Sequence, residues 1–132
     1  MKYDILVIEE SSPTLRGRIV SALAREGFDV ATAASSQEMV STLDEFKPRL
    51  IILGEGLPID SFEACSQLRR AVNVPILMVG AVLSDRAWNR VVESGADCYL
   101  AKPFGYLELA ARVKALLRRH EWTREKKQGR KE

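Results

Sequence analysis

The sequence contains few features that mark membrane proteins, disulfide-rich secreted domains or metalloenzymes. Its 132 residues include two cysteines and one histidine, and Cys65 and Cys98 have neither metal-ligand nor redox spacing. No apolar run approaches the roughly 20 residues that a membrane span requires. Acidic residues flank the first short apolar run, where a secretory signal would carry basic ones. We therefore expect a reduced, cytoplasmic protein that does not contact a membrane.

The small net charge of +2 is unevenly distributed along the chain. Residues 118–132 hold seven Lys and Arg against three acids, a net charge of +4, so the first 117 residues carry −2. A short basic tail is more often a solvated helix end or a linker than a nucleic-acid contact. We predict one domain over residues 1–119, followed by a basic tail or linker over residues 120–132.

Five short apolar runs alternate with amphipathic segments. The runs cover residues 4–8, 28–33, 49–53, 74–79 and 98–101. They are apolar on both faces, as expected for parallel strands between two layers of helices. Helices are predicted to follow Ser12 and Ser61 as their N-caps, to open at Ser36 and at Ser84, and to begin near Tyr106. The pattern predicts an α/β fold, a three-layer αβα sandwich with a doubly wound, five-stranded parallel sheet.

In an open sheet of this kind, a functional site is expected at the carboxyl ends of the strands. Those ends fall at Glu9–Glu10, Gly54–Leu57, Gly80–Ala81 and Lys102–Pro103. No pairing of a nucleophile with a base, and no phosphate-binding glycine loop, is found there. The sequence therefore predicts no enzyme activity.

Several segments together resemble the signatures of a response-regulator receiver domain. They are ILVIEE (5–10), LIILGEGLP (50–58), VPILMVGA (74–81), GADCYLAKPF (95–104) and ELAARVKALLRR (108–119). The strongest likeness is to receivers of the winged-helix transcription-factor subclass. The resemblance implies the flavodoxin-like (βα)5 receiver topology and a role in two-component signal transduction and transcription regulation.

In that family two acids hold Mg²⁺, an aspartate accepts a phosphoryl group, and a hydroxyl residue and a lysine bind the phosphate. Here Glu9 and Glu10 stand at the acid pair, each one methylene longer than aspartate. Gly54 replaces the acceptor aspartate, and Gly80 replaces the hydroxyl residue. Because Mg²⁺ demands near-ideal octahedral geometry, the longer acids do not favour it. We expect no cofactor and no phosphotransfer.

Two members of the family pocket are retained, Lys102 and the aromatic switch residue Tyr99. We expect Lys102 to pair with Glu9 or Glu10. Glu55 is the one nearby carboxylate, but adjacent strand residues face opposite ways, so we expect it to point away from the pocket. The proline after the lysine implies a cis peptide bond there, as in the family.

Receivers of this subclass dimerise through the face formed by the fourth helix, fifth strand and fifth helix. Asp97, Glu108, Arg112 and Arg119 match charged members of that face. Cys98 stands where a second acid is usual, and Trp88 where a basic residue is usual. Two interpretations of Trp88 stay open: an exposed anchor, the residue type enriched at interface hot spots, or a shield over the core.

The first hypothesis is an atypical, phosphorylation-independent receiver that dimerises or binds proteins through this face. DNA would then be contacted only through an output domain outside this chain. The alternative is a sensor of a small ligand or metal between Glu9, Glu10 and Lys102. A conventional phosphoacceptor would require Glu55 to take the place of the aspartate.

Overall fold

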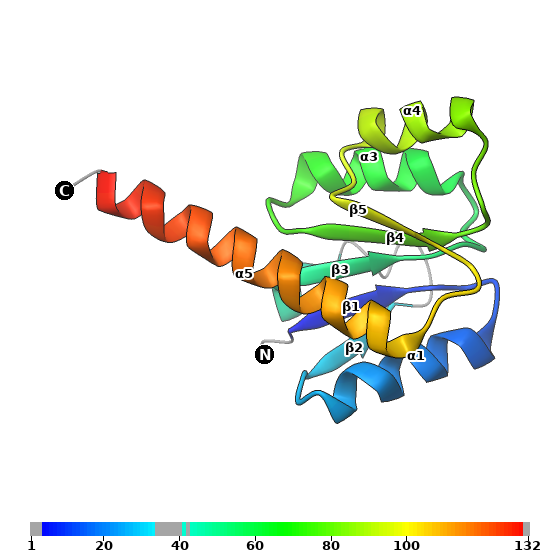
Figure 1. Cartoon of the computed structure of the whole chain (residues 1–132), viewed down its shortest axis with the longest axis horizontal. Helices are drawn as coiled ribbons and strands as arrows, with labels where there is room; N and C mark the ends of the chain where they lie inside the picture. Colours follow the sequence, from blue (N-terminus) through cyan, green and yellow to red (C-terminus); the bar gives the residue numbers. More distant parts are fainter. Residues whose placement is uncertain (1–3, 34–40, 42, 131–132) are drawn as a thin grey trace.

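Five parallel strands form the middle layer of the structure (Figure 1). The computed structural model describes residues 4–33, 41 and 43–130. The strands are β1 (Ile5–Ile8), β2 (Val30–Thr32), β3 (Leu50–Leu53), β4 (Ile76–Gly80) and β5 (Cys98–Ala101). Their order in the sheet is β2-β1-β3-β4-β5, and all neighbours are parallel. The predicted doubly wound topology is therefore confirmed.

Helices cover both faces of the sheet. They are α1 (Pro13–Arg25), α3 (Ser61–Ala71), α4 (Asp85–Ser94) and α5 (Tyr106–Arg130). Side chains alternate along each central strand, so that Ile5 and Val7 pack under α1 and α5 while Leu6 and Ile8 pack under α3. The predicted start at Ser36 lies outside the described residues, although residues 41 and 43–46 are helical.

Two predicted helix ends are confirmed by capping contacts. The Ser12 hydroxyl accepts a hydrogen bond from the Leu15 amide at 3.1 Å, ahead of Pro13 at the first helical position. Gly95 ends α4 in the left-handed region, with φ of 86°, which glycine adopts without the penalty of a Cβ.

The predicted cap of α3 is wrong by one residue. Asp60, not Ser61, is the N-cap, and its carboxylate accepts hydrogen bonds from the Phe62 and Glu63 amides. Both residue types cap helices well, so the pattern alone did not separate them. Ser61 is the first helical residue, and its hydroxyl donates to the Gly54 carbonyl at 3.2 Å.

The helix α5 continues past residue 119 to Arg130 and extends beyond the sheet (Figure 1). Its extension is attached to the amino end of the sheet, because Arg49 pairs with both Asp4 (3.1 Å) and Glu121. Among the described residues, no helix combines the length and the apolar character that a membrane crossing needs.

Asp60 caps α3 and also forms an ion pair with Arg90, in which Asp60 Oδ1 lies 2.9 Å from Arg90 Nη2. Two substitutions separate these two roles. We expect Asp60→Ala to lower the free energy of unfolding by about 1 kcal/mol, the usual loss of a capping side chain. Asp60→Asn should lose only a few tenths, because the amide oxygen accepts the same backbone hydrogen bonds. Urea denaturation of both variants checks this, and equal losses would mean that the ion pair matters rather than the cap.

Candidate functional site: the carboxyl edge of the sheet

The strand order brings four chain segments together at the carboxyl edge of the sheet. β1, β3, β4 and β5 lie side by side, so the residues that follow them converge. These residues include Glu9, Gly54 and Lys102, and they meet Gly80, the last residue of β4. The bond between Lys102 and Pro103 is cis, as the resemblance implied.

The carboxylate of Glu9 occupies the space beside Gly54. A Cβ on Gly54 would lie 2.5 Å from Glu9 Oε1, which is closer than atoms can pack. The Glu9 side chain is fully buried, and three donors hold it: the Glu55 amide at 3.1 Å, and the Ser11 hydroxyl and Ser12 amide at 2.8 Å each. A buried carboxylate is stable only with such partners. The missing side chain at position 54 is thus replaced by a neighbouring one.

Lys102 pairs with two carboxylates. Its Nζ lies 4.0 Å from Glu9 Oε1, as predicted, but only 2.9 Å from Glu55 Oε1. The expectation that Glu55 points away from the pocket is therefore wrong. Strand alternation does not reach Glu55, because β3 ends at Leu53 and the chain turns at Gly56 with φ of 88°.

Sequence reasoning missed Glu55 as the partner of Lys102. A usable signal was present, since glycines on both sides of Glu55 mark the end of a strand. The Glu55 carbonyl also accepts hydrogen bonds from the Glu10 and Ser11 amides, at 2.8 and 3.0 Å. These bonds fix the loop after β3 against the loop after β1.

The second acid of the pair, Glu10, lies toward Arg16 at 3.6 Å and is partly exposed. Both oxygens of Glu9 are already held by donors, and Gly54 supplies no carboxylate. In the part of the chain that the structure describes, no three acidic, cysteine or histidine side chains come close enough to share a metal ion. The acid pair that the receiver resemblance implies for a magnesium ion is thus divided, because donors hold Glu9 while Glu10 is directed toward Arg16.

Tyr99 fills the space beside the second glycine. A Cβ on Gly80 would lie 2.6 Å from the Tyr99 hydroxyl oxygen. That hydroxyl donates to the Ala81 carbonyl at 2.6 Å. The Tyr99 ring meets Trp88 edge-on, with centroids 5.6 Å apart. Burial raises the pKa of Tyr99, and the charge of Glu55 raises it further.

Comparisons with known proteins identify the family of this chain. Residues 5–114 match the family of the response regulator receiver domain. The chain belongs to this family. It is 43% identical to the alkaline phosphatase synthesis transcriptional regulatory protein PhoP of Bacillus subtilis, over 92% of this chain and 51% of that protein. It is 40% identical to the transcriptional regulatory protein AfsQ1 of Streptomyces coelicolor, over 88% of this chain and 52% of that protein.

This receiver domain also resembles solved structures. A two-component response regulator from Clostridium difficile has a TM-score of 0.80 at 28% identity, covering 89% of this chain and 98% of that one. The receiver chain spans about half the length of the curated relatives it matches. These relatives are named as transcriptional regulators.

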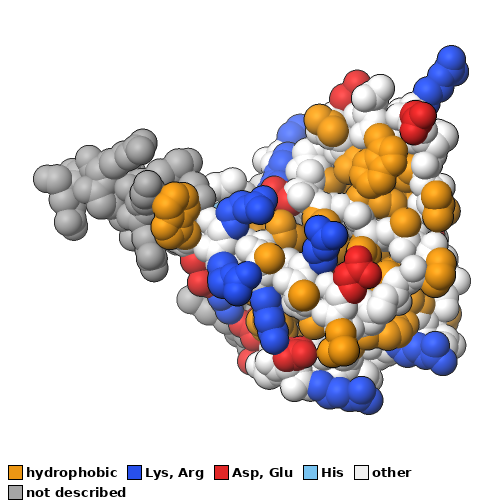
Figure 2. Space-filling view, in the orientation of Figure 1, with side chains coloured by type: hydrophobic (Ala, Val, Ile, Leu, Met, Phe, Trp, Pro, Cys, Tyr) orange, Lys and Arg blue, Asp and Glu red, His pale blue; other side chains and the backbone are white. Residues whose placement is uncertain are grey.

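On α4 of the receiver, Trp88 has the features of both interpretations. It packs against Tyr99, yet 46% of its surface is exposed. Val92 on the same helix is 78% exposed. Figure 2 shows hydrophobic side chains grouped over α4, at the upper right of the molecule. An apolar group of this kind on a small domain often marks an interaction surface.

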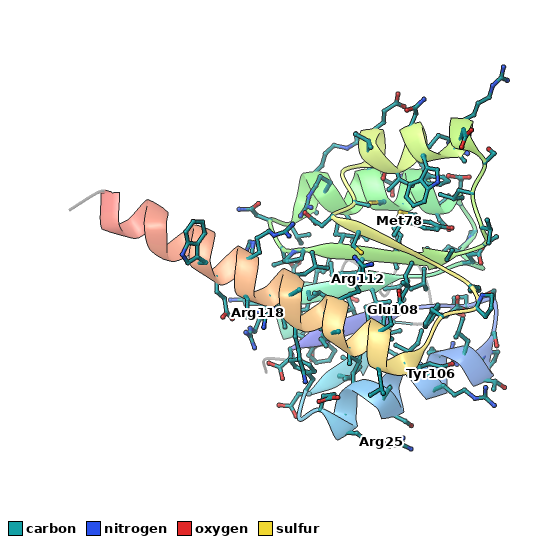
Figure 3. All side chains as sticks on the ribbon, viewed as in Figure 1. Arg25, Met78, Tyr106, Glu108, Arg112 and Arg118 are labelled. Carbon is teal, nitrogen blue, oxygen red and sulfur yellow. The ribbon has the colours of Figure 1, made fainter. Side chains whose placement is uncertain are left out.

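The charged residues predicted for the same face of the receiver differ in their surroundings. Asp97 is engaged within the chain, because it pairs with Arg69 at 3.0 Å and accepts the Ile76 amide at 2.8 Å. Glu108 and Arg112 lie one turn apart on the side of α5 toward the viewer (Figure 3). Among the described residues neither of these two forms an ion pair.

Cys98 lies on β5 between these elements and is half-buried. Burial raises the pKa of its thiol, while the positive charges of Arg112 and Arg119 act in the opposite direction. The two arginines are thus near enough to β5 for their charges to reach it. Both arginines belong to α5, one of the elements of the predicted face.

The fit of Glu9 beside Gly54 predicts that a side chain added at position 54 would force the Glu9 carboxylate out of its place. We expect Gly54→Ala to lower the free energy of unfolding by about 1–3 kcal/mol, as overpacking of a filled core does. Gly17→Ala is the matched control, since an added Cβ there meets nothing within 4 Å. In the helix interior this control should raise stability by about 0.5–1 kcal/mol. Thermal and urea unfolding check both, and a Gly54→Ala variant as stable as the parent would contradict the fit.

The effect of the Glu55 charge on Tyr99 predicts a pH dependence. The pKa of Tyr99 is raised by burial first and by Glu55 second, so Glu55→Gln should lower that pKa without returning it to its usual value. The raised pKa of Tyr99 stabilises the folded chain fully below pH ~10, the pKa of tyrosine in the unfolded chain. This stabilisation is lost as the pH rises through the pKa of Tyr99 in the folded chain.

An NMR titration of ¹³Cζ-labelled tyrosine measures this pKa. Glu26→Gln is the control, because Glu26 also pairs with a lysine, Lys114 at 2.7 Å, in another part of the molecule. An equal shift in both variants would contradict a local effect of Glu55.

Proposed function

We propose that this chain is a phosphorylation-independent receiver domain, a dimerisation or protein-interaction module of transcription regulation. The observation that carries the proposal is the buried Glu9 carboxylate, whose Oε1 lies 2.5 Å from the place of a Cβ at position 54. The position that would hold an acceptor aspartate has no side chain, and its space is taken. A phosphoryl group therefore has neither an atom to bind nor room to enter.

The other groups that would meet a phosphoryl group support the same proposal. Lys102 is neutralised by Glu55 at 2.9 Å, so its charge is already balanced. Gly80 has no hydroxyl, and the Tyr99 hydroxyl lies in its place. The pocket is thus closed by contacts within the chain, and these contacts do not depend on a signal.

The face formed by α4, β5 and α5 is the proposed contact surface. It carries exposed apolar side chains, Trp88 and Val92, beside charges of both signs on α5, Glu108 and Arg112. A two-fold dimer brings the same patch of both copies together, so opposite charges on one patch can meet their counterparts on the other. We propose a homodimer through this face, with a protein partner as the alternative occupant.

Two further parts of the proposal rest on the relatives. Because they are named as transcriptional regulators and are about twice as long as this chain, we propose that DNA is contacted through an output domain and not by the receiver. The sensor alternative, with a ligand between Glu9, Glu10 and Lys102, has less support, because Glu9 and Lys102 already bind other groups of the chain.

Loss of the phosphoryl response can be tested by NMR. We expect the backbone amide spectrum of the whole chain to stay unchanged with Mg²⁺ and then with Mg²⁺ plus beryllofluoride, a phosphoryl mimic. A receiver that has its acceptor aspartate serves as the positive control. Shifts near Glu9 and Glu10 with Mg²⁺ alone would favour the sensor alternative. Shifts that reach Tyr99 only after beryllofluoride would overturn the proposal.

The dimer can be tested by charge exchange. We expect sedimentation equilibrium to detect a dimer that Arg112→Glu weakens, and that the double variant Arg112→Glu with Glu108→Arg recovers. Arg18→Glu, on α1 and outside the face, is the matched control and should leave the dimer unchanged. A chain that stays monomeric at all concentrations would contradict a homodimer, and a double variant no better than the single one would exclude the Glu108–Arg112 contact.

A further inference from the structure

The position of Tyr99 depends on the residue at position 80. The side-chain hydroxyl of Tyr99 lies 2.6 Å from the place of a Cβ at Gly80, whereas the ring carbon that bears it lies 3.5 Å away. The first distance is a clash, and the second is an ordinary van der Waals contact. Only the oxygen of Tyr99 therefore requires a glycine at position 80.

The same hydroxyl is held by a second contact, and the ring by a third. The hydroxyl donates to the Ala81 carbonyl at 2.6 Å, in the residue directly after Gly80. The ring packs edge-on against Trp88 at 5.6 Å. Trp88 is nearly half exposed on α4, so Tyr99 connects the end of β4 to the outer surface.

Glu55 connects this cluster to the pocket. Its carboxyl carbon lies 3.5 Å from the place of a Cβ at Gly80, and its oxygen accepts from Lys102 at 2.9 Å. The carboxylate is thus a permanent anion on the pocket lysine, next to the space that Tyr99 fills. All of these contacts are made between residues of the protein itself.

We propose that Gly80 sets the α4 surface: the missing side chain lets Tyr99 lie over the end of β4, where Tyr99 supports Trp88 in its exposed position. Glu55 completes the arrangement, because it supplies the negative charge that Lys102 requires. The inference rests on the proposed function, since it names the single state in which a phosphorylation-independent receiver would be held. It also names the determinant of that state, a glycine.

A double-mutant cycle tests this inference. In a Trp122→Phe background, Trp88 is the one tryptophan, and its emission reports its surroundings. We expect Gly80→Ala to shift the Trp88 emission maximum and the amide signals of residues 88 and 99, because the added Cβ displaces the Tyr99 hydroxyl. In a Tyr99→Phe background, the same Gly80→Ala change should cause almost no shift, because no oxygen lies in the way. Such non-additivity is the sign of direct coupling.

Matched variants keep the result interpretable. Gly17→Ala adds the same methyl group at an open site and should leave Trp88 unchanged. We also expect Gly80→Ala to weaken the proposed dimer, and we expect this weakening to disappear in the Tyr99→Phe background. Additive effects, or an unchanged Trp88 signal in Gly80→Ala, would overturn the inference. If Gly80→Ala alone fails to fold while the double variant Gly80→Ala with Tyr99→Phe folds, this rescue would confirm the clash. If neither variant folds, position 80 excludes side chains for another reason and the inference fails.

The double-mutant cycle and the beryllofluoride titration test different claims, so their negative results can be distinguished. A response to beryllofluoride would overturn the phosphorylation-independent function, whatever the cycle shows. An additive cycle in a chain that ignores beryllofluoride would leave that function standing and overturn only the role of Gly80.

Discussion

The burial of one carboxylate, that of Glu9, determines the rest of the pocket. A buried anion requires donors and a nearby cation, and here the donors are the Ser11 hydroxyl and two backbone amides, with Lys102 at 4.0 Å. The extra methylene of glutamate carries the carboxylate into the space beside Gly54. An aspartate at position 54 could not share that space, so the long acid and the glycine form a complementary pair.

The two glycines of the pocket have the same structural role. Each leaves a space that a longer neighbour fills: Glu9 beside Gly54, and Tyr99 beside Gly80. Glu55 lies between the two and pairs with Lys102. Under the proposed function, packing and ion pairs among these residues take the place of the receiver's phosphoryl chemistry. A surface that depends on such fixed contacts can bind a partner at all times, which suits a constitutive interaction module better than a switch.

The sequence was sufficient for the fold because its signals were local and consistent. Apolar runs without alternation indicated buried parallel strands, and Ser12 and Gly95 marked helix ends by their capping chemistry. The site was predicted in part: the convergence of Glu9, Gly54, Gly80 and Lys102 followed from strand order. The direction of Glu55 did not, because it lies just past the end of β3, where strand alternation no longer applies. The pairing of Asp97 with Arg69 joins distant segments, which no local pattern encodes.

A crystal structure of the chain grown with Mg²⁺ and beryllofluoride tests the central claim most directly. We expect the Glu9 carboxylate beside Gly54, Lys102 paired with Glu55 and the Tyr99 hydroxyl over Gly80, with neither ion bound at the carboxyl edge of the sheet. A magnesium ion between Glu9 and Glu10, or a beryllofluoride group on Glu55 in contact with Lys102, would contradict this expectation. The pocket would then bind ligands in the space that we assign to its own side chains.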